Sequence, residues 1–541
     1  MSFGLHPIKN CWPWLCAILS GVLCSLAFPP VEQAWLAWIG LGPLIAAIWF
    51  APTCRRPQLR ALGLGFVFGL THFYSLFYWI TTVTFIGWLA LIPYLAIYPA
   101  VWSWMLARWL NPNHYRQHGS RSVWLSSTSN LRVAFLGAAI WCSTEFLRGW
   151  LFTGFGWNAL GVSQFDQTFL IQGAAFTGVY GISFLIVLIN LIAVITVKRL
   201  VMEVGQTKLR PHLDFNLSIV IVVLFFVYGI RHFVTPIPTI NLKVAAIQPN
   251  IPQDEKWAAA QASSILTRLS KLTELALAAN PDLLVWPEAA TPRPLLHDQF
   301  TFNTVRDFTS RMDGDFLIGS LYFAPDGDFN SAIFLANRGN TIERYDKMHL
   351  VPFGEFIPFR KTFPLFAWIA GDLVPGDFTS GKEATVFQLS QKNVRIAPLI
   401  CFEDTIGRVT RRFSHAQPQL LVNITNDGWF LESSASRQHL ANAVFRCVEL
   451  NLPMLRCANT GVTAIIDRYG RVTQRVVTPE GSTFTEGILI GSLAAPATPP
   501  KTFYARYGEV FSYACLLFSV LTPLLQGSQI QRTPIQHSSH S

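Results

Sequence analysis

The sequence predicts two fold classes in one chain, an α-helical transmembrane bundle and a layered α/β domain. Composition indicates the bundle, because 51% of the 541 residues are hydrophobic and only 13% are charged, about half the charged share of a soluble protein. The chain also contains apolar runs of about 20 residues, the length that crosses a bilayer as a helix. Residues 235–505 indicate the α/β domain, since short β-rich runs alternate there with helical patterns.

The apolar runs predict eight membrane spans, seven before residue 235 and one near the C-terminus. The uncharged run 61–107 is too long for one helix, so we expect a hairpin of two helices that turns near Thr82–Gly87. The other six predicted spans are residues 11–28, 34–52, 131–152, 167–197, 213–233 and 508–527.

Positive charge predicts the orientation of the bundle. Arg and Lys gather in loops of one parity, namely Arg55, Arg56, Arg60, Arg116, Arg121, Lys198, Arg199, Lys208 and Arg210. The positive-inside rule then places the N-terminus in the cytoplasm. We expect a seven-helix bundle over residues 1–234, a domain on the far side over 235–505, and a last span with a polar cytoplasmic tail over 506–541. These short clusters explain the net charge of +10 better than a nucleic-acid surface does, and we expect no nucleic-acid partner.

Strand-like runs organise residues 235–505. They are 242–248, 282–288, 315–320, 393–401 and 419–425, and a helical pattern covers 258–280. Strands that are buried on both faces and separated by helices predict a layered α/β domain.

The nine cysteines show neither a CxxC pair nor zinc-finger spacing, so we predict no metal site and no cofactor. Cys447 and Cys457 lie close in sequence, and the pattern leaves open whether they form a disulfide.

Three segments place a reactive side chain after an apolar strand-like run or in a Gly/Pro-punctuated loop just beyond one. They are "LLVWPEAATP" with Glu288, "RYDKMHLVPFGEFIP" with Lys347 and Glu355, and "LICFED" with Cys401. Taken singly, each residue has a structural interpretation: a carboxylate near a helix N-terminus, a solvated lysine, a side chain that caps or pairs, and an inert thiol. Together they supply the base, cation and nucleophile that covalent acyl transfer requires.

These segments resemble the Glu–Lys–Cys signature of the nitrilase, or carbon–nitrogen hydrolase, superfamily, and "KMHLVPFGEFIP" is the most specific of them. The likeness extends to the predicted spans and to two further segments, "STEFLRGWLFTGFGWNALG" (143–161) and "QPNIPQDEKW" (248–257). Over nearly its full length the chain resembles the apolipoprotein N-acyltransferase family. This resemblance implies a four-layer αββα sandwich for residues 235–505.

Acyl-transfer chemistry assigns a role to each residue. Glu288 would take the proton of Cys401, and Lys347 would face the developing oxyanion together with the backbone N–H after Cys401. Glu355 would orient Lys347 or the incoming amine. Phe402 and Glu403 match the family pattern after the nucleophile, although Phe402 lacks the hydroxyl of a tyrosine there. We also count Trp257, Glu355, Phe402 and Glu403 among the residues that bind substrate or support the site.

The resemblance implies a multi-pass enzyme of the bacterial inner membrane with its catalytic domain on the periplasmic side. It would move a fatty acyl chain from a phospholipid, through a Cys401 thioester, to the N-terminal amine of an S-diacylglyceryl-cysteine apolipoprotein. Ping-pong kinetics and a monomer are expected. Two alternatives stay open: a tethered amidase or nitrilase that uses water, and a lipid-sensing receptor or transporter without catalysis.

An acyl donor from the bilayer would explain the bundle, because moving an acyl chain into water costs about 0.8 kcal/mol per CH₂. The aromatic segment 356–371 could line an acyl path or form a buried loop, and residues 426–436 are a candidate lid. Glu145 and Arg148 lie near the outer end of the fifth predicted span, where they could contact lipid head groups or pair with each other.

Overall fold

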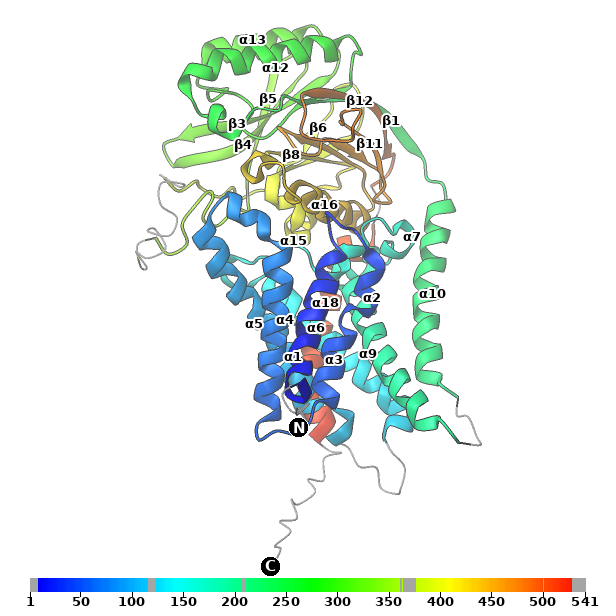
Figure 1. Cartoon of the computed structure of the whole chain (residues 1–541). Helices are drawn as coiled ribbons and strands as arrows, with labels where there is room; N and C mark the ends of the chain where they lie inside the picture. The colour runs from blue at the N-terminus through cyan, green and yellow to red at the C-terminus, as the bar shows by residue number, and fades with distance from the viewer. Residues whose placement is uncertain are drawn as a thin grey trace, which may run out of the picture.

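A bundle of helices carries a two-sheet sandwich at one end (Figure 1). The computed structural model describes residues 8–114, 123–206, 211–360, 362, 376–499 and 501–527. The helices of the bundle, with the short ones at its upper end, are α1 (Ile8–Leu26), α2 (Ala37–Gly40), α3 (Gly42–Phe50), α4 (Pro57–Leu76), α5 (Phe85–Trp109), α6 (Ser127–Arg148), α7 (Thr168–Ile171), α8 (Ala174–Thr177), α9 (Val179–Glu203), α10 (Leu213–Val234), α17 (Phe503–Tyr507) and α18 (Val510–Gly527).

The predicted helical hairpin is confirmed as α4 and α5, although the chain turns slightly earlier than expected, between Leu76 and Phe85. Two other predicted spans are interrupted. The run 34–52 divides into α2 and α3 after a short 3₁₀ turn. The run 167–197 begins with α7 and α8, and α9 starts only after Gly178, whose φ of 65° a residue without a side chain adopts readily.

Length and composition qualify four of the described helices as membrane spans: α4, α5, α9 and α10. Shorter apolar helical stretches occupy Cys11–Leu26, Ala34–Phe50, Thr168–Thr177 and Val510–Leu525. The helix α6 is not among either group. The count of eight spans therefore stays a prediction.

The sandwich consists of two six-stranded sheets. The first has the order β12-β1-β2-β3-β4-β5, with β1 (Thr239–Gln248), β2 (Leu283–Trp286), β3 (Asp315–Ala324), β4 (Gly327–Ala336), β5 (Thr341–Asp346) and β12 (Gly487–Pro496). The second has the order β11-β10-β9-β8-β7-β6, with β6 (Phe387–Gln388), β7 (Arg395–Ile400), β8 (Leu420–Thr425), β9 (Met454–Ala458), β10 (Ala464–Ile466) and β11 (Val472–Arg475). All five predicted strand segments are confirmed within these strands.

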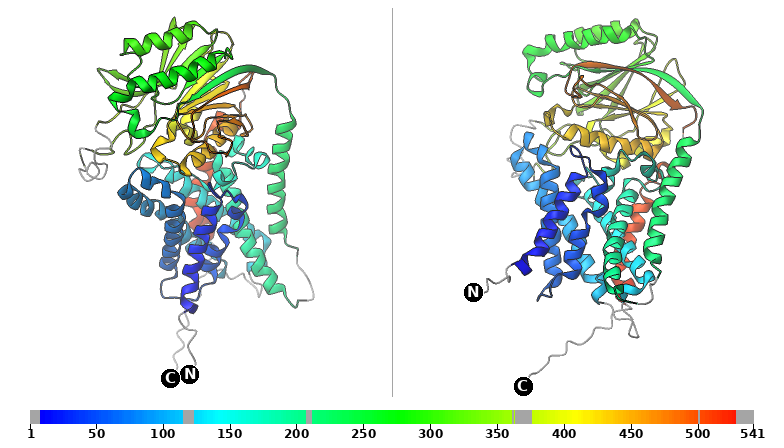
Figure 2. Two further views of the ribbon diagram at one scale, coloured as in Figure 1. Left: turned by 45° about the horizontal axis from the view of Figure 1, so that its top comes forward. Right: turned by 45° about the vertical axis from the view of Figure 1, so that its right-hand side comes forward.

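Helices cover both outer faces of the sandwich, which gives the expected αββα layers (Figure 2). The helices α12 (Ala262–Leu277) and α13 (Gln299–Ser310) lie on the first sheet, away from the bundle. The helices α15 (Gly407–Arg412) and α16 (Ala435–Leu450) lie between the second sheet and the bundle. Strand β1 shows why its sequence is apolar throughout, because Val244 packs into the core between the sheets and Ala245 into the core under α12.

Cys447 and Cys457 are both buried free thiols, on α16 and β9 respectively, so the structure contains no disulfide between them.

The side chain of Gln438 on α16 ties the sandwich to the bundle. Its Oε1 accepts hydrogen bonds from Trp79 Nε1 and Asn158 Nδ2, each at 2.9 Å. Its Nε2 donates to the carbonyls of Pro29 at 3.1 Å and Leu76 at 3.0 Å. One amide thus holds three separate segments of the bundle, which fixes the bundle against the helical layer under the second sheet.

We predict that Gln438→Leu lowers the thermal unfolding midpoint of the full chain in detergent micelles by roughly 5–10 °C. The physical reason is that each buried polar group left without a partner costs about 1–3 kcal/mol. Gln391→Leu, in an exposed loop of the sandwich, is the matched control and should leave the midpoint unchanged. Equal midpoints for the two variants would contradict the anchoring role.

Candidate active site

Glu288, Lys347 and Cys401 each follow a strand of the sandwich, as the sequence predicts. Glu288 comes just after β2 and Lys347 just after β5 in the first sheet, and Cys401 directly follows β7 in the second. All three are buried, with 7%, 1% and 9% of their surface exposed. The two sheets therefore contribute to one enclosed group of reactive side chains.

Lys347 lies between two carboxylates. Its Nζ is 2.9 Å from Glu355 Oε1 and 3.5 Å from Glu288 Oε1. Burial lowers the pKa of Lys347, but the carboxylates of Glu355 and Glu288 outweigh burial and raise the pKa above its ordinary value. The lysine therefore stays an ammonium ion.

Asn330 on β4 completes this cluster, although no motif in the sequence indicated this residue. Its Nδ2 donates to Glu288 Oε1 and to Glu355 Oε1, both at 2.8 Å. The backbone N–H of Val351 donates to Glu355 Oε2 at 2.8 Å. Every contact fixes a carboxylate oxygen, so β4 and the loop after β5 together position the two acids around Lys347.

Cys401 occupies a sharp corner between β7 and the 3₁₀ turn Cys401–Thr405, with φ of 51°. Its carbonyl accepts hydrogen bonds from Asn423 Nδ2 at 3.2 Å and from the His439 ring at 3.3 Å. Burial raises the pKa of the Cys401 thiol, Glu288 adds to the rise, and Lys347 opposes it. The thiol is thus protonated at neutral pH, and its reaction as a nucleophile needs a base.

Glu403 connects the Cys401 corner with the Lys347 loop. Its carboxylate accepts from the Tyr345 hydroxyl at 2.8 Å and from the backbone N–H groups of Met348 at 2.7 Å and Ile400 at 2.8 Å. Burial raises the pKa of Glu403 to about 7, although these donors favour the charged form. These contacts indicate that Glu403 stabilises the fold by holding the two segments together.

Phe402 and Trp257 have different surroundings. The Phe402 ring stacks on Trp157, a residue of the bundle, with ring centres 5.9 Å apart. Trp257 is 51% exposed, and the ammonium of Lys256 lies 5.9 Å from its ring centre. Lys256, which the sequence did not single out, donates to the Glu288 carbonyl at 2.9 Å, and burial lowers its pKa to about 8.

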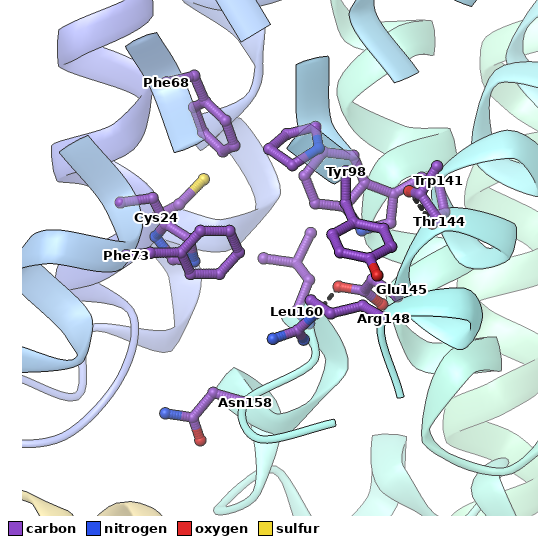
Figure 3. A pocket seen from close by; sticks show the side chains of 12 residues that line it. Cys24, Phe68, Phe73, Tyr98, Trp141, Thr144, Glu145, Arg148, Asn158 and Leu160 are labelled. Atoms are coloured by element: carbon purple, nitrogen blue, oxygen red, sulfur yellow. Dashed lines mark hydrogen bonds between the residues drawn. The ribbon is translucent and has the colours of Figure 1, made fainter. Parts of the chain in front are cut away.

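Glu145 and Arg148 line a cavity inside the bundle together with Phe68, Tyr98 and Asn158 (Figure 3). In the described part of the chain the two residues form no ion pair within 4.0 Å of each other. Instead, Glu145 accepts from the Leu160 N–H at 2.7 Å, and Arg148 Nη1 donates to the Trp157 carbonyl at 2.9 Å. Their observed role is to hold the loop that carries Trp157 under Phe402.

The structure describes all of the candidate lid, residues 426–436, but only part of the aromatic segment 356–371. Of the aromatic segment 356–371, residues 361 and 363–371 lie outside the described residues, so its role stays a prediction. Within residues 426–436, Phe430 packs on Trp79 of the bundle with ring centres 4.6 Å apart, and the Trp429 carbonyl accepts from Thr82 Oγ1 at 3.4 Å.

Two sheets between helical layers, with a buried Glu, Lys and Cys after their strands, define a carbon–nitrogen hydrolase fold. Residues 243–498 match the family model described as carbon-nitrogen hydrolase, and residues 20–192 match that of the apolipoprotein N-acyltransferase N-terminal domain. Among solved structures, a CN-hydrolase superfamily protein from Xanthomonas campestris is 18% identical and covers 51% of this chain and 97% of its own, with a TM-score of 0.37.

Curated relatives match almost end to end. An apolipoprotein N-acyltransferase from Geobacter metallireducens is 35% identical over 97% of this chain and 96% of its own length. Another from Rhodopseudomonas palustris is 29% identical over 95% of this chain and 96% of its own. The chain belongs to the apolipoprotein N-acyltransferase family.

We predict that Tyr345→Phe lowers the free energy of unfolding by about 1.5–3 kcal/mol, because it removes a hydrogen bond to a buried carboxylate. Chemical denaturation in micelles, followed by tryptophan fluorescence, measures this loss. Tyr322→Phe is the control, since the Tyr322 hydroxyl has no hydrogen bond within the described residues. A loss no larger in Tyr345→Phe than in the control would show that Glu403 does not depend on the hydroxyl.

Proposed function

We propose that this protein moves a fatty acyl chain from a phospholipid to the N-terminal amine of an S-diacylglyceryl-cysteine apolipoprotein, the last acylation in lipoprotein maturation. The observation that carries the proposal is the buried Glu288–Lys347–Glu355 cluster beside Cys401 in a chain of this family. Lys347 is not a solvated loop lysine, since it is 1% exposed.

In the first step Glu288 takes the proton of the Cys401 thiol, and the thiolate attacks the ester carbonyl of the phospholipid. The Lys347 ammonium and the Phe402 N–H stabilise the oxyanion. A C–S bond forms and the C–O ester bond breaks. Glu288 returns its proton to the departing alkoxide, which leaves as a lysophospholipid.

In the second step the amine attacks the Cys401 thioester. Glu288 accepts a proton from the amine, the C–N bond forms and the C–S bond breaks. The thiolate then recovers the proton, and the site returns to its starting state. Glu355 keeps Lys347 in place throughout, because its Oε1 lies 2.9 Å from Nζ.

We further propose an inner-membrane monomer with eight spans, both termini in the cytoplasm and the sandwich on the periplasmic side. The parity of the Arg and Lys loops supports this orientation. The site also lies on the bundle side of the sandwich, since Phe402 stacks on Trp157. A donor that stays in the bilayer avoids the cost of exposing its chain to water.

Incubation of the purified chain with phospholipid alone, followed by intact-mass measurement, tests the proposal. We expect a fatty-acyl addition that Cys401→Ala abolishes and that an added diacylglyceryl lipopeptide amine removes. Steady release of fatty acid without an amine would instead indicate a hydrolase that uses water. Neither adduct nor release would leave a binding protein without catalysis.

We predict that Lys347→Met slows formation of the acyl adduct about 10²–10³-fold, the usual effect of losing one oxyanion-stabilising group. Lys271→Met, on the exposed face of α12, is the matched control and should acylate at the wild-type rate. Thermal unfolding of both variants identifies any loss of folded protein. A folded Lys347→Met that acylates normally would remove Lys347 from the mechanism.

A further inference from the structure

A second buried charge cluster lies behind Cys401, and the mechanism uses none of its four side chains. It consists of Asp404, Asp427, His439 and Arg456, which come from four different elements. Their side chains are at most 1% exposed. Two acids and two bases at this depth must balance each other, because an unpaired buried charge is strongly destabilising.

The contacts of His439 define its protonation. Nδ1 is 2.8 Å from Asp427 Oδ1, and Nε2 is 2.7 Å from Asp404 Oδ1. Nε2 also lies 3.3 Å from the Cys401 carbonyl oxygen. Carboxylate and carbonyl oxygens only accept hydrogen bonds, so both ring nitrogens must carry a proton. His439 is therefore an imidazolium ion.

Arg456 completes the balance on the same two carboxylates. Its Nη1 contacts Asp404 Oδ2, and its Nη2 lies 3.1 Å from Asp427 Oδ2. Nη1 also donates to Asn423 Oδ1 at 3.1 Å. The amide of Asn423 in turn donates to the Cys401 carbonyl at 3.2 Å. Both donors to that carbonyl thus belong to the cluster or are held by it.

Cys401 needs such support, because its backbone φ of 51° is sterically unfavourable for a residue with a side chain. The backbone conformation of this corner sets the orientation of two groups, the Cys401 thiol and the following Phe402 N–H. The Trp157 ring, 5.0 Å from the His439 ring, closes the cluster on the bundle side. A loosened carbonyl would therefore shift both the nucleophile and the oxyanion donor.

We propose that His439 is a positioning residue, which as an imidazolium ion holds the Cys401 carbonyl and so aligns the thiol and the Phe402 N–H for acyl transfer. The proposal rests on the proposed function only in taking Cys401 as the nucleophile. His439 does not touch the acyl group itself.

The charged groups that face the ring predict how this support depends on pH. Burial and Arg456 lower the pKa of His439, whereas Asp404 and Asp427 raise it, and the pKa is raised to about 8. A raised pKa means that the imidazolium contacts are complete at neutral pH and are lost as the pH rises through about 8. In the neutral ring one nitrogen has lost its proton, and the lone pair of this nitrogen then faces an oxygen that can only accept a hydrogen bond.

The experiment compares two reactions of Cys401 in the full chain in micelles. Acylation by p-nitrophenyl butyrate, counted as the butyryl addition to the intact mass, needs the aligned oxyanion donor. Alkylation by iodoacetamide needs only an accessible thiolate. We expect the wild-type acylation rate to fall above pH about 8, while the alkylation rate continues to rise.

The variant His439→Gln should lower the acylation rate at neutral pH about 100-fold, the usual effect of a lost oxyanion donor. It should change the alkylation rate less than about threefold, since the thiol stays accessible. His415→Gln, at an exposed position, should change neither rate. Equal losses of both rates would mean a merely structural role and would overturn the proposal.

The wild-type profile decides the matter even where His439→Gln fails to fold, because acylation that rises with alkylation beyond pH 8 overturns the proposal. Acylation by p-nitrophenyl butyrate without any adduct from phospholipid would refute the proposed function alone. Absence of both adducts from wild-type protein would refute both.

Discussion

The burial of the Lys347 ammonium constrains how the segments after β2 and β5 are arranged in the sandwich. An unpaired buried charge costs several kcal/mol, so the chain must bring Glu288 and Glu355 to Nζ at 3.5 and 2.9 Å. Asn330 bridges the two acids from β4, which keeps like charges from facing each other without a donor between them. These contacts fix the segments after β2 and β5 relative to each other and hold the Glu288 carboxylate close to the Lys347 ammonium.

The second cluster extends the same constraint into the second sheet and toward the bundle. His439 and Arg456 neutralise Asp404 and Asp427 with no help from solvent. The Trp157 ring then covers this cluster from the bundle side. The bundle thus does more than anchor the sandwich, because one of its loops packs on His439, which contacts the Cys401 carbonyl.

The sequence predicted those features that local pattern determines. Strand-like apolar runs predicted five strands, and reactive side chains at the ends of such runs or in Gly/Pro-punctuated loops predicted Glu288, Lys347 and Cys401 as site residues. Local pattern did not reveal Asn330 or His439, because their importance comes from partners far away in sequence. For the same reason the number of spans stays open, since packing within the bundle interrupts apolar runs that look continuous.

The backbone is strained at two corners of the site, one after Glu288 and one at Cys401. Ala289, directly after Glu288, has φ of 44°, and Cys401 has φ of 51°. Glycine would relieve both positions but would loosen the loops. The fold fixes the first corner through Gly319, where an added Cβ would lie 2.2 Å from the Pro287 carbonyl oxygen, and through the Ala290 N–H bond to the Gly319 carbonyl at 2.8 Å. The second corner is held from two other elements, because Asn423 of β8 and His439 of α16 both contact the Cys401 carbonyl.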